Sequence, residues 1–347
     1  MMPTPDYRRL LAAIEHSEPD RVPLAELGFD SAVKEAFLGR RVRGACDEVE
    51  FWWRAGYDYL YLRPSYEYLG APGSAAVGTP LHDQPDSEPF SMTRGGPVRS
   101  WADLESYPWP DPATVDCTRI LEAASLVPEG MGIISGVGGI FTRTWMITGF
   151  EHFCLSLSSD PQLVAAVFRK VGQIQAEVVR RITVFPKVFA IWYGDDLAFG
   201  TSLLVSPRIY RSHLYPWIEE MVSIAHQAHM PFILHTDGKV WALLDDLVAM
   251  GVDVLHPIEP TAMDIAEVKQ RYGKRLALFG NVDLGSTLVS GSPEDVRQEV
   301  RERIRTLAPG GGYAVGSSNT VTSYVPTENF NAMREATLEY GHYPICC

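Results

Sequence analysis

The stretch F-I-L-H-T-D-G, residues 232–238, is an apolar run that favours a β-strand and ends in His235, Asp237 and Gly238. Side chains two positions apart on a strand share a face, so His235 and Asp237 project side by side where the strand ends. Two other runs end in a similar way, Y-G-D-D (193–196) and L-A-L-F-G-N-V-D (276–283). Polar residues at the C-terminal ends of successive buried strands predict an active site at one mouth of an α/β barrel.

Eight strand-like runs alternate with helical patterns, which is the signature of repeated βα units. The predicted strands are 22–27, 57–62, 131–137, 187–193, 232–235, 252–257, 276–280 and 313–317. The predicted helices are 5–14, 143–157, 161–184, 240–250, 262–272, 293–307 and 327–340. This order predicts an α/β fold, a single (β/α)8 TIM-type barrel domain over residues 1–347. An open doubly wound sheet is the alternative, and it is disfavoured because G-V-G-G-I-F (136–141) lacks the G-x-G-x-x-G spacing.

The alternation stops between about residues 70 and 112, a stretch rich in Pro, Gly, Asp and Ser. An irregular stretch of this length inside a compact domain is usually functional. The sequence therefore predicts an irregular insertion near the barrel mouth, after the second strand.

The bulk composition narrows the class of partner and compartment. The 347 residues carry a net charge of −13, which disfavours nucleic acid and anionic membrane surfaces as partners. The five cysteines show no ligand-like spacing, and this favours a reducing compartment without a disulfide framework. No apolar run has the length of a membrane span or the form of a signal peptide. These features predict a cytoplasmic protein that acts on a small molecule.

His235 and Asp237 are candidates for an acid–base pair or for metal ligands, because a carboxylate orients an imidazole and raises its pKa. The alternative is a histidine held by hydrogen bonds at a strand end, with Asp237 capping the helix that follows. The predicted catalytic residues are His235, Asp237 and Asp195, with His235 and Asp237 as the metal ligands. The predicted substrate-binding residues also lie near strand ends and are Glu26, Tyr193, Asp196, His256, Asn281, Asp283 and Ser317. For Asn281 and Asp283, hydrogen bonds between loops are an equal alternative, and His256 also fits a structural role.

Several motifs together resemble the uroporphyrinogen decarboxylase superfamily, which also holds the corrinoid- and coenzyme M-dependent methyltransferases. They are P-D-R-V-P (19–23), S-W-A-D-L-E-S-Y-P-W-P-D-P (100–112), G-G-I-F-T-R-T-W (138–145), T-G-F-E (148–151), H-T-D-G (235–238), F-G-N-V-D-L (279–284) and A-P-G-G-G-Y (308–313). The resemblance covers about residues 19–340, and the family fold is a TIM-type barrel.

The chain departs from the porphyrin-decarboxylating members at two places. Those enzymes carry an R-Q-A-G-R-Y-type segment near the first strand, where this chain reads A-E-L-G-F-D (25–30) without arginine. The family's histidine near the last strand is replaced within G-S-S-N (316–319). The mouth is therefore predicted to be acidic and poor in arginine, and such a mouth would repel a substrate with many carboxylates.

The methyltransferase branch resembles the chain better. Its thiol-activating members hold zinc through a histidine, a cysteine two residues later and a cysteine after the last strand; the matching positions here are His235, Asp237 and Ser317. Without the thiolates, the resemblance implies a harder divalent metal site of His235, Asp237 and another carboxylate such as Glu26, with zinc as the first candidate. It also implies a corrinoid carried by a partner protein.

We therefore expect an enzyme that moves a methyl group between a small molecule, for example a methoxylated one, and a corrinoid protein or other acceptor. One alternative is a decarboxylase or lyase that acts on a non-porphyrin substrate with His235 and Asp237 as acid–base groups. The other is a barrel that binds a ligand without catalysis. A homodimer is one assembly that such a chain could form.

Overall fold

Seven parallel strands form the centre of the molecule in a computed structural model that describes residues 4–66 and 95–345. The strands pair in chain order, β1 to β7, so each strand is parallel to the next. They are β1 (Tyr59–Leu62), β2 (Gly132–Gly138), β3 (Val188–Gly194), β4 (Phe232–His235), β5 (Val254–His256), β6 (Ala277–Phe279) and β7 (Tyr313–Ala314). Each parallel connection passes through at least one helix, as the sequence predicted.

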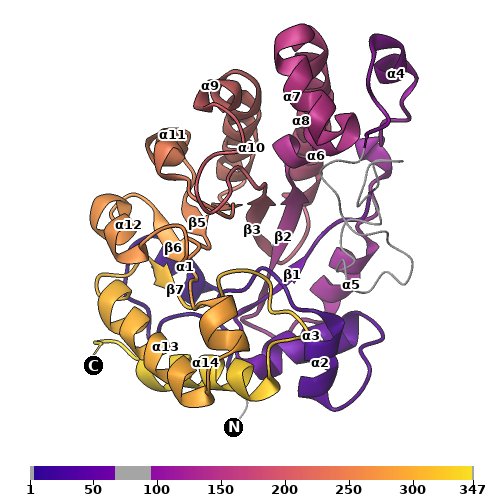
Figure 1. The fold of residues 1–347 in the computed structure, drawn as a ribbon. Coiled ribbons are helices and arrows are strands. Elements are labelled where there is room, and N and C mark those ends of the chain that lie inside the picture. Colours follow the sequence, from indigo (N-terminus) through magenta and orange to yellow (C-terminus); the bar gives the residue numbers. More distant parts are fainter. Residues whose placement is uncertain (1–3, 67–94, 346–347) are drawn as a thin grey trace.

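The helices lie around the outside of the strands (Figure 1). They are α1 (Arg8–Ile14), α2 (Ser31–Leu38), α3 (Ala45–Ala55), α4 (Trp101–Ser106), α5 (Thr118–Leu126), α6 (Ile140–Thr148), α7 (Phe150–Ser159), α8 (Pro161–Ile182), α9 (Pro207–Ile209), α10 (Tyr215–Gln227), α11 (Leu244–Ala249), α12 (Ile265–Tyr272), α13 (Pro293–Leu307) and α14 (Thr327–Tyr340). Short 3₁₀ or π turns cover Pro112–Thr114, Tyr210–Leu214, Trp241–Leu243 and Leu284–Val289.

Helix α8 illustrates how the local sequence sets an element and then buries it. The Asp160 side chain accepts a hydrogen bond from the backbone N–H of Leu163, and Pro161 occupies the first turn, where its missing N–H costs nothing. Apolar residues at helical spacing, including Val167 and Val171, are fully buried. Strands β2 and β4 are buried along their whole length, so the core lies between the sheet and these helices.

The first predicted strand, 22–27, is not a strand in the structure. Leu24 forms one parallel bridge with Val315, next to β7, and the N–H of Ala25 donates to the Val315 carbonyl at 2.7 Å. On the other side, Glu26 and the Tyr59 hydroxyl of β1 exchange hydrogen bonds of 2.6 and 2.7 Å. Pro23 has no N–H for a regular ladder, and a tyrosine side chain replaces the backbone partner. The segment therefore contacts both edge strands without extending the sheet.

Two other expectations need correction. The single helix predicted over 143–157 is two helices, because Gly149 between α6 and α7 has φ 80° and ψ 130° and leaves the helical conformation. The insertion predicted over 70–112 lies outside the described residues as far as 94. Of the remainder, Trp101–Ser106 forms α4 instead of an irregular stretch, and its cap is Ser100, whose hydroxyl accepts from the N–H of Asp103.

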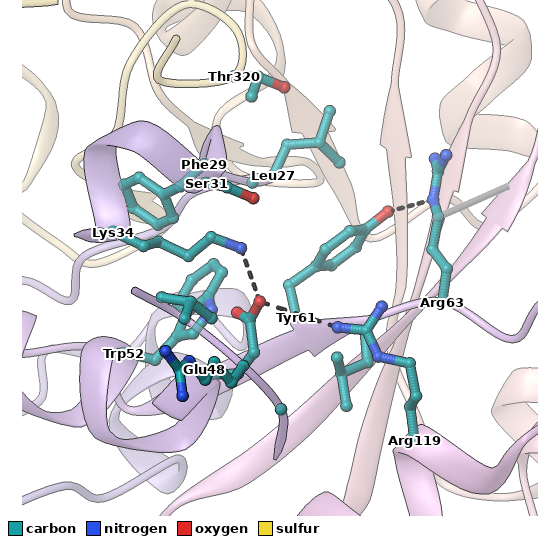
Figure 2. A pocket seen from close by; sticks show the side chains of 15 residues that line it. Leu27, Phe29, Ser31, Lys34, Glu48, Trp52, Tyr61, Arg63, Arg119 and Thr320 are labelled. Atoms are coloured by element: carbon teal, nitrogen blue, oxygen red, sulfur yellow. Dashed lines mark hydrogen bonds and ion pairs between the residues drawn. The ribbon is translucent and has the colours of Figure 1, made fainter. Parts of the chain in front are cut away.

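A cavity of about 530 Å³ opens beside the end of β1. Its walls include Lys34 of α2, Glu48 and Trp52 of α3 and Tyr61 of β1 (Figure 2).

Among the described residues, no helix has the length and apolar character needed to cross a membrane.

Candidate active site

The C-terminal ends of three neighbouring strands lie level with one another. In the pairing register, Gly194 of β3 is opposite His235 of β4, and His235 is opposite His256 of β5. The residues that follow β3 and β4 therefore begin at the same end of the sheet, as expected for the mouth of a parallel α/β fold.

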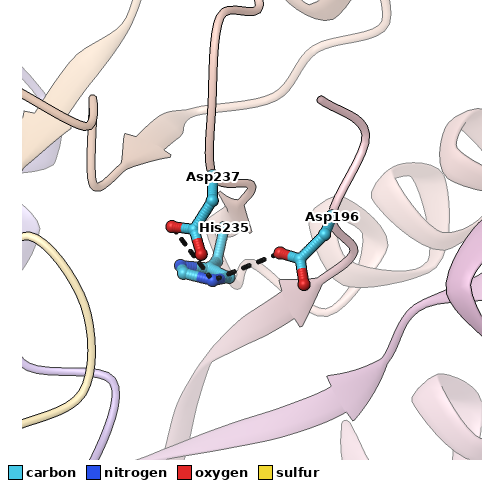
Figure 3. A group of neighbouring side chains, drawn as sticks. All are labelled: Asp196, His235 and Asp237. Carbon is cyan, nitrogen blue, oxygen red and sulfur yellow. Dashed lines mark ion pairs between the residues drawn. The ribbon is translucent and has the colours of Figure 1, made fainter. Parts of the chain in front are cut away.

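Asp196, His235 and Asp237 form a compact cluster at this end (Figure 3). One ligand atom from each residue lies within 4.8 Å of the other two. His235 Nε2 is 3.7 Å from Asp196 Oδ1 and 3.9 Å from Asp237 Oδ1. The His235 side chain is 8% exposed and that of Asp196 is 54% exposed, so the cluster is buried at His235 and open to solvent at Asp196.

The Asp237 carboxyl group lies in a partly desolvated position between opposing charges. Burial raises its pKa to about 6, and the carboxylates of Asp196 and Glu259 act in the same direction, whereas His235 and Asn319 favour the ionised form. The amide nitrogen of Asn319 donates to Asp237 Oδ2 at 2.8 Å. Within the described part of the chain, the buried Oδ1 atom has no hydrogen-bond partner. An unpaired carboxylate oxygen that faces an imidazole and a second carboxylate suits a cation or a substrate donor.

His256 lies beside His235 on the neighbouring strand, and the hydrogen bond between them sets the tautomer of His235. The two Nδ1 atoms are 2.8 Å apart, so one of them donates and the other accepts. His256 is fully buried with its ring edge-on to Trp192, and burial, followed by the charge of His235, lowers its pKa well below the usual value. A neutral His256 that donates leaves a proton on His235 Nε2; one that accepts leaves that nitrogen free to bind a metal.

Asp195 and Tyr193 are turned toward helix α6 instead of the cluster. The Asp195 carboxylate accepts hydrogen bonds from the backbone N–H groups of Phe141 and Thr142, both at 2.8 Å, and from the Tyr193 hydroxyl. The Tyr193 oxygen also accepts from the N–H of Ile140 at 2.9 Å. These contacts satisfy the free N–H groups in the first turn of α6. Asp195 thus caps the first turn of α6, and its catalytic role stays a prediction.

Glu26 and Ser317 bind each other instead of joining the three-residue cluster. The Glu26 carboxyl oxygens accept from the backbone N–H and from the hydroxyl of Ser317, both at 2.7 Å. Glu26 has no exposed surface, and this burial raises its pKa to about 8 in spite of the two hydrogen bonds. The carboxylate that joins His235 and Asp237 is therefore Asp196 rather than Glu26.

Asn281 and Asp283, which share a face in the sequence, separate in the structure. Asn281 is buried and its amide nitrogen donates to the carbonyl of Ile258 at 2.7 Å; its Oδ1 atom has no partner among the described residues. Asp283 accepts from the N–H groups of Gly285 and Ser286 and caps the turn Leu284–Val289. Asn281 therefore offers a buried polar atom for a ligand, whereas Asp283 uses one carboxylate oxygen to cap a turn.

Sequence reasoning missed Arg63 and Asn319. Arg63 directly follows β1, and its Nη2 atom lies 3.2 Å from where a Cβ atom on Gly194 would be, while His235 Cδ2 lies 3.7 Å from the same point. The mouth therefore has at least one arginine, which the sequence analysis did not place there. The strand-end argument that identified His235 would have found Arg63, because Arg63 directly follows the predicted second strand, 57–62. No sequence signal identifies Asn319, because it is far from Asp237 in the sequence and the two meet only in the folded chain.

Comparisons with known proteins agree with this architecture. The family model described as uroporphyrinogen decarboxylase (URO-D) matches residues 73–340. A uroporphyrinogen decarboxylase of Alkalilimnicola ehrlichii is 28% identical over 69% of this chain and 67% of its own length, and one of Pseudomonas savastanoi pv. phaseolicola is 26% identical over 70% and 71%. Among solved structures, a methyltransferase from Methanosarcina mazei has a TM-score of 0.68 at 18% identity, covering 96% of this chain and 98% of that one. Because the family model matches more than half of this chain, the chain belongs to the uroporphyrinogen decarboxylase family.

Proposed function

We propose that the protein is a methyltransferase-like enzyme that moves a methyl group between an oxygen-bearing small molecule, such as a methoxylated one, and a corrinoid protein or other acceptor. The observation that carries this proposal is the cluster of Asp196, His235 and Asp237 at the strand ends. Membership of the family and the likeness in fold to a methyltransferase over nearly the whole chain support it.

The donor atoms of the cluster fit a divalent metal ion. One imidazole nitrogen and two carboxylate oxygens suit zinc or a harder divalent ion, and Asp237 Oδ1, which has no hydrogen bond from any described residue, faces the other two groups. Such an ion, when bound, supplies Lewis acidity that weakens the bond between a substrate oxygen and its methyl group. The absence of thiolate from this donor set favours an oxygen substrate over a thiol.

The chain's own residues position the cluster and the substrate. Asn319 holds Asp237 through its amide, and His256 holds the His235 ring through the hydrogen bond between the two Nδ1 atoms. Asp196 is half exposed and can rotate toward an incoming group. Arg63 places its guanidinium beside Gly194, on the same side as the His235 ring, where it can bind negative charge on the substrate.

A second candidate function is proton transfer in a decarboxylase or lyase that acts on a non-porphyrin substrate. The buried Nε2 atom of His256 has no partner among the described residues. A buried N–H without an acceptor costs more than a buried lone pair without a donor, so this favours the form in which His256 donates from Nδ1. His235 then carries its proton on Nε2, facing Asp196 and Asp237, where it can donate a hydrogen bond to negative charge that develops on the substrate.

Metal binding by three variants tests the first proposal. We expect the purified protein to bind one zinc or cobalt(II) ion per chain. Asp196→Asn and Asp237→Asn should each raise the dissociation constant for the metal by roughly tenfold or more. His226→Gln is the matched control, because His226 pairs with Asp253 at 2.8 Å at the opposite ends of β4 and β5 and should leave metal affinity unchanged. Activity is followed as methylcobalamin formed from cob(I)alamin and a panel of methoxylated compounds.

Methylation that proceeds equally well in chelator-treated protein would contradict the metal role. The second candidate would be established by two results together. The parent protein would exchange protons into a carboxylated substrate but transfer no methyl group, and His235→Gln would lose the proton exchange.

A further inference from the structure

The cavity beside β1 has a charge opposite to that of the whole chain. Its lining includes the cations Lys34, Arg43, Arg63 and Arg119, and one carboxylate, Glu48. The chain as a whole has 43 acidic residues against 30 lysines and arginines. A volume of about 530 Å³ is in the usual range for a small-molecule site.

Glu48 is shared between two of these cations (Figure 2). Its Oε1 atom lies 2.7 Å from Lys34 Nζ and 3.8 Å from a guanidinium nitrogen of Arg119. Lys34 and Glu48 are both more than nine-tenths buried. Among the described residues of the lining, Glu48 balances one of the four cations, so an excess of positive charge remains in a partly desolvated space.

Apolar side chains lie between these charges. Leu27, Trp52 and Tyr61 line the cavity, and Tyr61 extends between Glu48 and Arg63, to which its hydroxyl is hydrogen-bonded at 2.7 Å (Figure 2). Arg63 belongs both to this lining and to the neighbourhood of Gly194 and His235. The cavity and the cluster of Asp196, His235 and Asp237 are therefore connected through one side chain.

We propose that this cavity binds the anionic group of an organic substrate, a carboxylate or a phosphate, with Arg119 and Lys34 as its partners and with the apolar body of the substrate against Trp52 and Tyr61. The proposal rests on the proposed function, because it assigns a substrate class to the enzyme that the cluster serves. Fixed cations in a partly buried site bind anions strongly, since little solvent competes for them.

Calorimetric titration of the metal-free protein tests this site apart from the chemistry. The probes are inorganic phosphate, benzoate and acetate. We expect phosphate or benzoate to bind, and binding to weaken as sodium chloride is raised. Arg119→Gln should weaken that binding by about tenfold. Arg119 is suited to this test because its side chain is 54% exposed and its loss leaves the Lys34–Glu48 pair intact.

The control variant is Arg54→Gln, which removes an exposed arginine of α3 that pairs with Glu50 outside the cavity. It should bind the probes like the parent. Tighter binding of phosphate than of benzoate assigns a phosphate; tighter binding of benzoate than of phosphate and acetate assigns a carboxylate on an apolar body. Absence of binding by all three probes, or equal affinity in the parent and Arg119→Gln, overturns the proposal. Neither result involves metal or turnover, so the methyl-transfer proposal would stand or fall separately.

Discussion

Glu26 is a carboxyl group held in the core with Ser317 as its hydrogen-bond donor. It has no exposed surface, and burial raises its pKa to about 8. An unfolded glutamate titrates near its ordinary pKa of about 4.3. The folded state therefore keeps a proton that the unfolded chain has already released over most of the neutral range.

This difference predicts how stability depends on pH. Below the unfolded pKa both states are protonated and Glu26 has no effect. As pH rises toward 8, the unfolded state is increasingly favoured, by up to about 1.4 kcal/mol per pH unit. Glu26→Gln does not titrate and can keep both contacts to Ser317. Urea unfolding at pH 5, 6, 7 and 8 should therefore show the variant gaining stability over the parent as pH rises.

The exposed variant Glu302→Gln serves as the control, because the pKa of Glu302 lies below this window through its hydrogen bond with Arg305. A difference between Glu26→Gln and the parent that stays constant from pH 5 to 8 would mean that Glu26 is ionised in the folded protein.

The sequence could locate part of the candidate site at this scale. His235, Asp196 and Asp237 follow apolar runs, and strand ends can be recognised from such runs alone. The choice between Asp195 and Asp196 could not be made, because it depends on where the first turn of α6 approaches. The Lys34–Glu48 pair joins two separate helices, so only the packing of α2 on α3 reveals it.

At the scale of elements, helix α6 begins against the end of strand β3. The Asp195 carboxylate and the Tyr193 hydroxyl receive three backbone N–H groups from its first turn, so the strand end fixes where the helix starts. A carboxylate with acceptors on both oxygens is required, because each oxygen faces a donor.

Asp195→Asn should therefore destabilise the protein by about 1–3 kcal/mol, since the new amide nitrogen would face backbone N–H donors. Thermal and urea unfolding measure the loss. Asp264→Asn is the matched control: Asp264 caps α12 through one oxygen only, and asparagine caps a helix as well as aspartate does. If both variants lost the same stability, Asp195 would not be the cap of α6.

Helix limits could be predicted where the signals are local. Helices α13 and α14 span the predicted residues. At the start of α13, Ser292 and Asp295 form a capping box, and Pro293 directly follows Ser292. The division at Gly149 was missed, because its apolar flanks read as one continuous helix and only the backbone angles reveal the break.

At the scale of the whole molecule, the sheet is completed by a segment that is not a strand. Residues 22–26 contact Val315 beyond β7 through the backbone and Tyr59 of β1 through its hydroxyl. The prediction of eight strands placed this segment correctly between the two edge strands. It was wrong about the hydrogen bonds, because Pro23 and a tyrosine side chain interrupt the backbone ladder.

Tyr59→Phe should destabilise the protein by about 2–3 kcal/mol, because it leaves the buried N–H and carbonyl of Glu26 without their partner. Tyr57→Phe is a close control: Tyr57 is also buried, but its hydroxyl has no hydrogen-bond partner among the described residues. Its removal should be neutral or slightly stabilising in the same unfolding measurement. Equal losses in the two variants would exclude the hydroxyl bridge as a closing contact.

Arg63 and Gly194 mark the border between two regions contributed by different parts of the gene. The cationic cavity draws Lys34, Glu48 and Arg119 from the chain before β2, whereas the cluster comes from the C-terminal ends of β3 and β4 and the residues that follow them. Under the proposed function, substitutions in the amino-terminal helices that leave Arg63 in place would therefore change the substrate that is bound and leave the residues of the cluster unchanged.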